Sequence, residues 1–183
     1  LIKMNNKNLE EAKIFFTEGL KFLQEENYQE AEIKFIKSLD LSPGRLSIIH
    51  NLISIYINTD QKYKLKKLLE NYKNLSEEKE ILYGKAFSFY FENNYLDSIA
   101  VCKKIVEFQE FKFSIQDLLA SNFKKQKKFL DALKLYKQKL KEKKNHLVFY
   151  NIGLLFSELG RTRIAKYYFN KCREIKKDDH TNL

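Results

Sequence analysis

Residues 15–35 read FFTEGLKFLQEENYQEAEIKF, and residues 149–169 read FYNIGLLFSELGRTRIAKYYF. Three residues of the first stretch recur in the second at a fixed separation of 134 positions: Gly19 and Gly153, Ala31 and Ala165, and Phe35 and Phe169. That separation is four steps of about 33.5 residues, roughly the length of one helix-turn-helix repeat in solenoid proteins. The chain is therefore predicted to be an array of tandem helical units.

Five such units fit the chain and start near residues 12, 46, 79, 113 and 146. When each unit is numbered from 1 to 34, position 8 holds Gly19, Ile53, Ala86, Ala120 and Gly153, and position 20 holds Ala31, Leu65, Ser98, Ala132 and Ala165. Two antiparallel helices approach closely only where neither side chain is bulky, so small residues at both positions mark the crossing of a helical hairpin. Ile53 and Leu65 are both bulky, so the helices of the second unit are expected to sit farther apart or to repack.

Large apolar side chains occupy positions 4, 11 and 24 of nearly every unit, for example Phe15, Phe22 and Phe35 in the first and Phe149, Phe156 and Phe169 in the fifth. Gln116, at position 4 of the fourth unit, is the exception. This pattern resembles the tetratricopeptide repeat (TPR), whose signature has a bulky residue at 4, Leu-Gly at 7 and 8, Tyr at 11, Ala at 20, Phe at 24 and Pro at 32. Pro43 supplies that proline in the first unit, and the resemblance spans residues 12–179.

The predicted fold class is all-α, a right-handed superhelical α-solenoid of about five antiparallel TPR-like hairpins around one elongated core. The predicted division is an N-terminal extension with the start of the first helix, five repeats and a C-terminal tail: 1–11, then 12–45, 46–79, 79–112, 113–146 and 146–179, and finally 180–183. Hairpin turns are expected near residues 25, 59, 93, 127 and 160.

The last unit is not followed by the polar capping helix that solenoid ends usually need. We therefore expect the chain to be an excerpt of a longer protein. Its final helix, roughly 162–177, is expected to leave Tyr168 and Ile175 uncovered, and such an apolar end would favour a dimer or packing onto a following domain.

The composition is that of a protein able to bury a substantial core, with 183 residues of which 44% are hydrophobic. No run of 18 uninterrupted apolar residues occurs and the N-terminus has no hydrophobic segment. A cytoplasmic protein without a membrane span or signal peptide is expected. Cys102 and Cys172 occupy core-facing positions two repeats apart, so both are predicted to be small buried hydrophobic side chains without a disulfide.

No catalytic or cofactor-binding motif is found. His50, His146 and His180 are scattered, without the spacing of metal ligands. The five glycines form no phosphate-binding loop. The paired acidic residues fall at predicted helix starts and turns, where solvation and the helix dipole account for them. Neither an enzyme nor a metal- or cofactor-binding protein is predicted.

Positive charge is concentrated in the fourth unit. The chain has a net charge of +10, and residues 113–146 contain ten lysines against three acidic residues, a local net charge of +7. We call the cluster of Lys124, Lys125, Lys127 and Lys128 the basic patch. It indicates either a solvated lysine-rich face or a site for an anionic partner such as RNA or an acidic surface. Arginine, which specific nucleic-acid readers favour, is scarce, so nucleic acid is not the preferred partner.

The TPR resemblance implies that the first helices of successive hairpins line a concave groove that binds a protein or peptide. The family's ligand-contacting positions fall here on His50, Asn51, Tyr83, Phe87, Tyr90, Tyr150 and Asn151. Tyrosines combine aromatic area with a polar tip, and the two asparagine amides are expected to hold a peptide backbone as the family's groove asparagines do. The family's carboxylate clamp for acidic C-terminal peptides matches only at Asn51 and is not expected.

A protein-interaction scaffold is therefore the predicted function, with two alternatives. One is an anion-binding helical repeat that uses the lysine-rich fourth unit. The other rests on residues 42–47, SPGRLS, which resemble the repeat junctions in N-terminal arrays of bacterial glycosyltransferases and sulfotransferases. In that case the array would position acceptors for a catalytic domain elsewhere in a longer chain.

Overall fold

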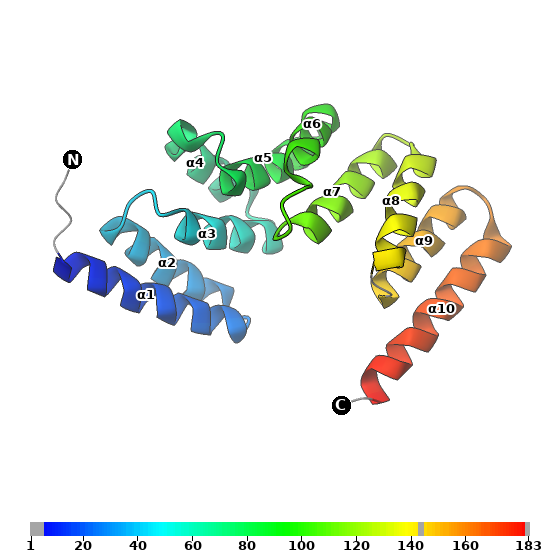
Figure 1. Ribbon diagram of the computed structural model, residues 1–183, viewed down its shortest axis with the longest axis horizontal. Coiled ribbons are helices and arrows are strands. Elements are labelled where there is room, and N and C mark those ends of the chain that lie inside the picture. The colour runs from blue at the N-terminus through cyan, green and yellow to red at the C-terminus, as the bar shows by residue number, and fades with distance from the viewer. Residues whose placement is uncertain (1–5, 143–144, 182–183) are drawn as a thin grey trace. The chain divides into compact units, whose positions relative to one another are not determined.

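The computed structural model describes residues 6–142 and 145–181. This part of the chain contains ten α-helices, one short 3₁₀ helix and no β-strand (Figure 1). The elements are α1 (Asn6–Gln24), α2 (Tyr28–Leu41), α3 (Leu46–Asn58), α4 (Lys62–Asn71), η1 (Lys73–Leu75), α5 (Lys79–Phe91), α6 (Tyr95–Ile105), α7 (Lys112–Lys125), α8 (Phe129–Glu142), α9 (His146–Glu158) and α10 (Thr162–Thr181). The predicted all-α fold class is confirmed.

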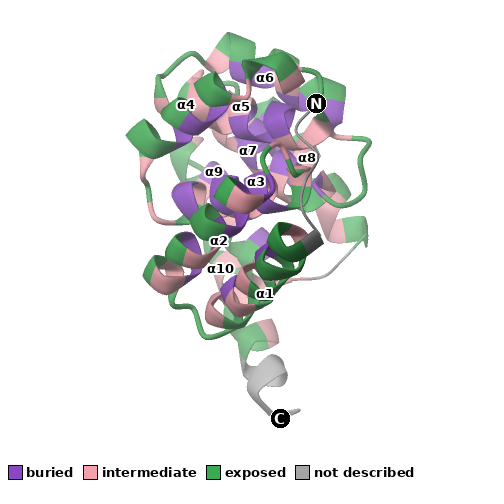
Figure 2. Cartoon of the chain, turned by 90° about the vertical axis from the view of Figure 1, so that its left-hand side faces the viewer, coloured by how far each residue is buried: buried purple, intermediate pink, exposed green. Residues whose placement is uncertain are grey.

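The helices form two compact units, one ending at Glu92 and the other beginning at Asn93. In the first unit α1 packs against α2, and α3 packs against α2, α4 and α5. In the second unit the contacts run in sequence from α6 to α7, α8, α9 and α10. Within these helices, buried residues lie along one side and exposed residues along the other (Figure 2). The continuous core and the repeat boundaries expected from the sequence stay predictions, and residues 1–5 and 182–183 lie outside the described residues.

Every predicted hairpin turn contains one residue in the left-handed backbone region. Those residues are Glu26 (φ 55°), Asp60 (φ 54°), Asn93 (φ 60°), Lys127 (φ 58°) and Gly160 (φ 68°). All five occupy position 15 of their units. In the first turn the Glu26 amide donates to the Leu23 carbonyl at 3.1 Å and the Asn27 amide donates to the Phe22 carbonyl at 2.9 Å. This is the Schellman ending of a helix, and the predicted turn positions are confirmed.

Side chains at the turns also begin the following helices. The Asn27 side chain accepts a hydrogen bond from the Glu30 amide at 3.3 Å, and the Asn94 side chain accepts one from the Asp97 amide at 3.5 Å. Each asparagine therefore caps an amide that has no partner within its own helix. The repeat thus encodes a helix end and a helix start within three residues.

The glycines at position 8 make room for an aromatic ring. A Cβ placed on Gly19 would lie 2.8 Å from Cε1 of Phe35, and one placed on Gly153 would lie 2.6 Å from Cε1 of Phe169. Both distances are shorter than a normal carbon contact. The two hairpins can therefore close only because the first helix has no side chain where the ring packs.

The second repeat uses a different solution, which is the repacking alternative expected from its bulky residues. Ile53 and Leu65 are both fully buried. The space for Ile53 comes from Gly84 on α5, where a Cβ would lie 3.1 Å from Cδ1 of Ile53 and 2.9 Å from Cδ2 of Leu69. A glycine on the neighbouring helix thus replaces the small residue missing from the hairpin itself.

Buried polar groups join neighbouring helices of the first unit. The Tyr56 hydroxyl donates to Oε1 of Glu32 at 3.1 Å, and Nζ of Lys64 lies 2.7 Å from the same oxygen. Burial, together with the adjacent Glu32 carboxylate, raises the pKa of Tyr56 well above its usual value. The carboxylate of α2 is therefore held between a neutral phenol on α3 and an ammonium group on α4.

The two cysteines differ in their surroundings. Cys102 is fully buried, and burial raises the pKa of its thiol to about 12. Cys172 is also a free thiol but is only half-buried, so the prediction that both are buried is wrong for Cys172. It lies on α10, where Ala165 is the only residue in the buried class among the described side chains of that helix.

The residues expected to be uncovered on α10 are only half-buried. The Tyr168 ring stacks on Phe156 with centroids 5.5 Å apart, which explains its partial burial, and Ile175 belongs to the same exposure class. The more exposed apolar side chains of α10 are Tyr167 at 56% and Ile164 at 42%. An apolar surface therefore exists on the last helix, and its more exposed members are Ile164 and Tyr167, which the sequence analysis did not name.

Replacing Gly153 by leucine is expected to lower the free energy of unfolding by about 1–3 kcal/mol, because the new side chain would collide with the Phe169 ring. The matched control is Ser157→Leu, at an exposed position of the same helix. Urea denaturation followed by circular dichroism measures both. An unchanged denaturation midpoint for Gly153→Leu would show that α9 and α10 are not in close contact there.

The left-handed turn residues give a reciprocal pair of variants. Lys127→Gly is expected to raise the free energy of unfolding by about 0.5 kcal/mol, since glycine removes a backbone strain of about 1–2 kcal/mol at the cost of some chain entropy. Gly160→Ala is expected to lower it by about 1 kcal/mol. Thermal and urea unfolding measure both shifts. Shifts of the same sign would contradict the shared turn geometry.

Candidate functional site

A row of aromatic side chains runs along one side of α5 in the first unit. Tyr83, Phe87 and Phe91 are four residues apart and therefore project from the same side of the helix. The Tyr83 and Phe87 ring centroids are 5.1 Å apart, and those of Phe87 and Phe91 are 6.3 Å apart. His50 of α3 extends the row, 5.7 Å from Tyr83, and Tyr90 lies 6.1 Å from Phe91. These five residues are called the aromatic row below.

The members of the aromatic row are not equally accessible. Tyr83 is buried, with 8% of its surface exposed, whereas His50, Phe87, Tyr90 and Phe91 are half-buried. The ring of Tyr83, a predicted partner-binding residue, packs between His50 and Phe87, and its part in binding stays a prediction. Tyr83 therefore supports the row, and the half-buried rings provide the surface that a partner can contact.

The predicted groove asparagines are placed on two different helices of two different units. Asn51 is half-buried on α3, and its Nδ2 donates to the Ser47 carbonyl of the same helix at 2.8 Å. Its amide is thus oriented by its own helix, which leaves Oδ1 as the atom suited to accept from a ligand. Asn151 is half-buried on α9, next to Tyr150, which is 46% exposed and packs 5.7 Å from Phe169.

The structure therefore brings together His50, Asn51, Tyr83, Phe87 and Tyr90 on α3 and α5, while Tyr150 and Asn151 belong to the second unit. Sequence reasoning missed Phe91. Its spacing of four residues from Phe87 was the available signal. Phe91 also borders a cavity of about 230 Å³ between α4 and α5, where Nζ of Lys62 lies 5.3 Å from the centroid of its ring.

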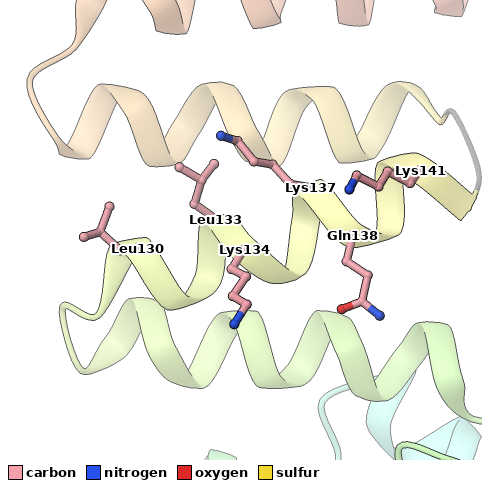
Figure 3. Close-up of a pocket in the computed structure, with 6 residues that line it drawn as sticks. All are labelled: Leu130, Leu133, Lys134, Lys137, Gln138 and Lys141. Carbon is pink, nitrogen blue, oxygen red and sulfur yellow. The ribbon is translucent and has the colours of Figure 1, made fainter.

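A second candidate surface lies on α8 in the second unit. A cavity of about 480 Å³ is lined by Leu130, Leu133, Lys134, Lys137, Gln138 and Lys141, all from this helix (Figure 3). Leu130 is 72% exposed. Within the part of the chain that the structure describes, none of the three lysines forms an ion pair. We call these six residues the α8 lysine face.

The predicted basic patch is located near the α8 lysine face but not on it. Lys124 and Lys125 end α7, and Lys127 and Lys128 lie in the turn before α8. Lys139 is engaged elsewhere, because its Nζ lies 2.5 Å from the Asp117 carboxylate. Lys143 and Lys144 lie outside the described residues.

The lysines of the α8 lysine face could have been found from their spacing. Lys134, Lys137 and Lys141 follow one another at intervals of three and four residues and therefore share one side of a helix. Counting charges over the whole unit concealed this arrangement.

Among the described residues, no group of three or more His, Cys, Asp or Glu side chains is placed to hold a metal ion. The side chain of His180 falls outside them. No helix in the described ranges is long and apolar enough to cross a membrane. The predicted absence of metal, cofactor and catalytic activity stays a prediction.

The fold defines the class of protein: paired helices joined by turns of one geometry form a helical-repeat protein of the α-solenoid class. No protein-family model matches the chain, and no curated protein matches it. Solved structures do match. MamA of strain MSR-1 is 16% identical with a TM-score of 0.65, and the match covers 92% of this chain and 98% of that chain.

Two further solved structures match over nearly the same length of this chain. A structure from the functional characterisation of PilF of Pseudomonas aeruginosa is 16% identical with a TM-score of 0.71, over 92% of this chain and 78% of that chain. MamA from Desulfovibrio magneticus RS-1 is 11% identical with a TM-score of 0.70, over 92% and 96%. MamA and PilF are TPR-repeat proteins, so the fold of this chain is TPR-like, as the sequence pattern predicts.

Proposed function

We propose that the protein is an interaction scaffold that binds an extended peptide segment of a protein partner along the aromatic row. The observation that carries this proposal is the run of half-buried rings on α5, continued by His50 of α3. Half-buried aromatic side chains offer a large contact area and lose little conformational freedom when a partner covers them. The TPR-like fold, shared with MamA and PilF, is consistent with such a role.

The spacing of the row favours an extended peptide. Residues four apart on a helix are separated by about 6 Å along its axis. Alternate residues of an extended strand are separated by about 6.6 Å and point to the same side. An extended peptide lying along α5 would therefore place every second side chain against the rings at Phe87 and Phe91. Oδ1 of Asn51 is suited to accept a hydrogen bond from its backbone.

The charged residues near the aromatic row indicate which charge the partner peptide carries. Lys62 lies over the Phe91 ring, and Lys66 forms an ion pair with Glu92 at 3.0 Å. Lys62 is mostly exposed and reaches Asp60 only at 3.5 Å. The ammonium group of Lys62 is therefore the charge at the end of the row that a partner carboxylate would meet. We infer a peptide with apolar side chains at alternate positions and an acidic residue at the end near Phe91.

Alanine at Phe87 or Tyr90 is expected to weaken binding of such a peptide at least fivefold, since removing an aromatic anchor usually costs more than about 1 kcal/mol. The ligands to measure are peptides selected on the whole protein from a random display library, with Kd determined by fluorescence anisotropy. The control is Tyr167→Ala, which removes a tyrosine that is 56% exposed and lies on α10 of the second unit. Thermal melts identify any variant that fails to fold.

Equal affinities of Phe87→Ala, Tyr90→Ala and the control would rule out the aromatic row as the binding surface. A loss of affinity in Tyr90→Ala, with an unchanged melting temperature, would support it even if Phe87→Ala proved unstable. The selected sequences provide a separate check. An extended mode predicts apolar residues at every second position, whereas a helical ligand would show them at intervals of three and four.

The second candidate function is binding of an anionic partner through the α8 lysine face. The observation in its favour is that three lysines without ion pairs among the described residues share a cavity with Leu130 and Leu133. Ammonium groups beside exposed apolar surface suit a ligand that carries both phosphate groups and bases. Single-stranded RNA is the ligand that this candidate predicts.

Reversing the charge at Lys134, Lys137 and Lys141 together is expected to abolish binding of a fluorescein-labelled single-stranded RNA, if this candidate is correct. A control with the same change in net charge is Lys67→Glu, Lys73→Glu and Lys166→Glu, at exposed positions elsewhere. Anisotropy titrations over a range of salt concentrations should then give a slope of log K against log salt of about −0.7 per phosphate contact. Equal losses in both triple variants would show only a general effect of charge.

A further inference from the structure

Gln116 departs from the repeat pattern because the other repeats carry an apolar residue at its position. A cavity lies beside it. The cavity has a volume of about 510 Å³ and belongs wholly to the second unit. It is lined by α6, α7, α8 and the loop that joins α6 to α7, through Lys103, Val106, Glu107, Gln109, Lys112, Gln116, Leu119, Phe123, Asp131, Lys134, Leu135 and Gln138. Its size falls within the range of about 300–1,000 Å³ that is typical of small-molecule sites.

The cavity borders position 4 of the fourth repeat, where the apolar side chain of the other repeats is missing. The other four repeats carry Phe15, Ile49, Leu82 and Phe149 at this position. The Gln116 side chain is one atom longer than that of leucine and ends in a carboxamide, which cannot pack as an apolar group. The fourth repeat therefore lacks the apolar filling that the other repeats have, and the open volume borders the same residue.

The carboxamide oxygen of Gln116 is buried, and no hydrogen-bond partner for it is found among the described residues. The residue as a whole is 4% exposed. Buried polar groups are nearly always hydrogen-bonded, because leaving one unpaired forfeits its interaction with water. Because Gln116 also borders the cavity, a ligand bound there can complete the hydrogen bonds of this carboxamide. Rotation of the terminal amide can present either its oxygen or its NH₂ group.

The remaining lining determines the chemistry of that ligand. Leu119 is buried, and Phe123 and Leu135 are half-buried, so these side chains provide an apolar wall. The charged residues are of both signs, Lys103 and Lys134 against Glu107 and Asp131.

The fifth charged residue of the lining is Lys112. Its Nζ is already paired with the Glu142 carboxylate at 2.9 Å. The other four charges balance, so the lining does not favour an ion of either sign, and a ligand without net charge fits it best.

We propose that this cavity binds a small uncharged molecule that carries an amide group on an apolar body, of about the size of a blocked hydrophobic amino acid. The amide pairs with the Gln116 carboxamide, and the apolar body packs against Leu119, Phe123 and Leu135. This site is separate from the aromatic row, and it shares Lys134 and Gln138 with the α8 lysine face. It gives the scaffold a ligand-binding site in its second unit.

The test is a titration of the whole protein, labelled with ¹³C at its methyl groups, with N-acetyl-L-phenylalaninamide. The expected result is saturable shifts of the Leu119 and Leu135 methyl signals. Gln116→Leu is expected to weaken binding at least tenfold and to raise the melting temperature, because it replaces an unpaired polar group by the apolar type found in the other repeats. Gln126→Leu, at a glutamine of the α7–α8 turn that does not line the cavity, is the control for the same change of side chain.

Three outcomes would overturn the proposal. The first is the absence of saturable shifts with the amide probe in the unsubstituted protein. The second is a lower melting temperature for Gln116→Leu, which would mean that the carboxamide has a structural partner. The third is tighter binding of hexanoate or hexylammonium than of the amide, which would show that charge and not amide pairing selects the ligand. Loss of amide binding in Gln116→Leu but not in Gln126→Leu would support it.

Discussion

A phenylalanine ring packed against a helix that lacks a side chain is the contact on which the first and last hairpins depend. The Phe35 ring occupies the space beside Gly19, and the Phe169 ring occupies the space beside Gly153. A methyl group on either glycine would lie no more than 2.8 Å from a ring carbon. Close approach of two helices brings their remaining side chains into contact along the hairpin. The large apolar residues at the other repeat positions can then be buried between the same two helices.

The turns have the same backbone geometry in every hairpin and so bring its two helices together in a similar way. A left-handed residue at the same position in each turn sends the second helix back along the first, and in the first unit an asparagine directly after that residue begins the new helix. Four of the five left-handed residues are not glycine, so most turns retain some backbone strain. The packing of each hairpin must therefore exceed that strain, which agrees with the burial of the residues at positions 20 and 24 of the first repeat, Ala31 and Phe35.

The candidate sites lie where the repeat pattern is altered. Ile53 is bulky where a small residue is expected and packs against Gly84 of α5, and most of the aromatic row lies on the same helix as Gly84. Gln116 replaces an apolar side chain and borders the largest cavity among those described above. A residue that weakens the packing of a repeat persists more readily if it serves another purpose, and departures from a repeat are therefore the places to look for binding.

Sequence alone determined the helical class, the repeat length and the turn positions, because these follow from local spacing: small residues at two positions, aromatic residues at others and polar residues between them. The candidate site was only partly predictable. The residues His50, Phe87 and Tyr90 could be named from the position they hold in the repeat, but the burial of Tyr83 depends on the packing of α3, which brings His50 against its ring. The same applies to the cavity at Gln116, which is lined from α6, α7 and α8. A cavity or an unpaired charge is a property of side chains from several helices, and only the tertiary structure brings those side chains together.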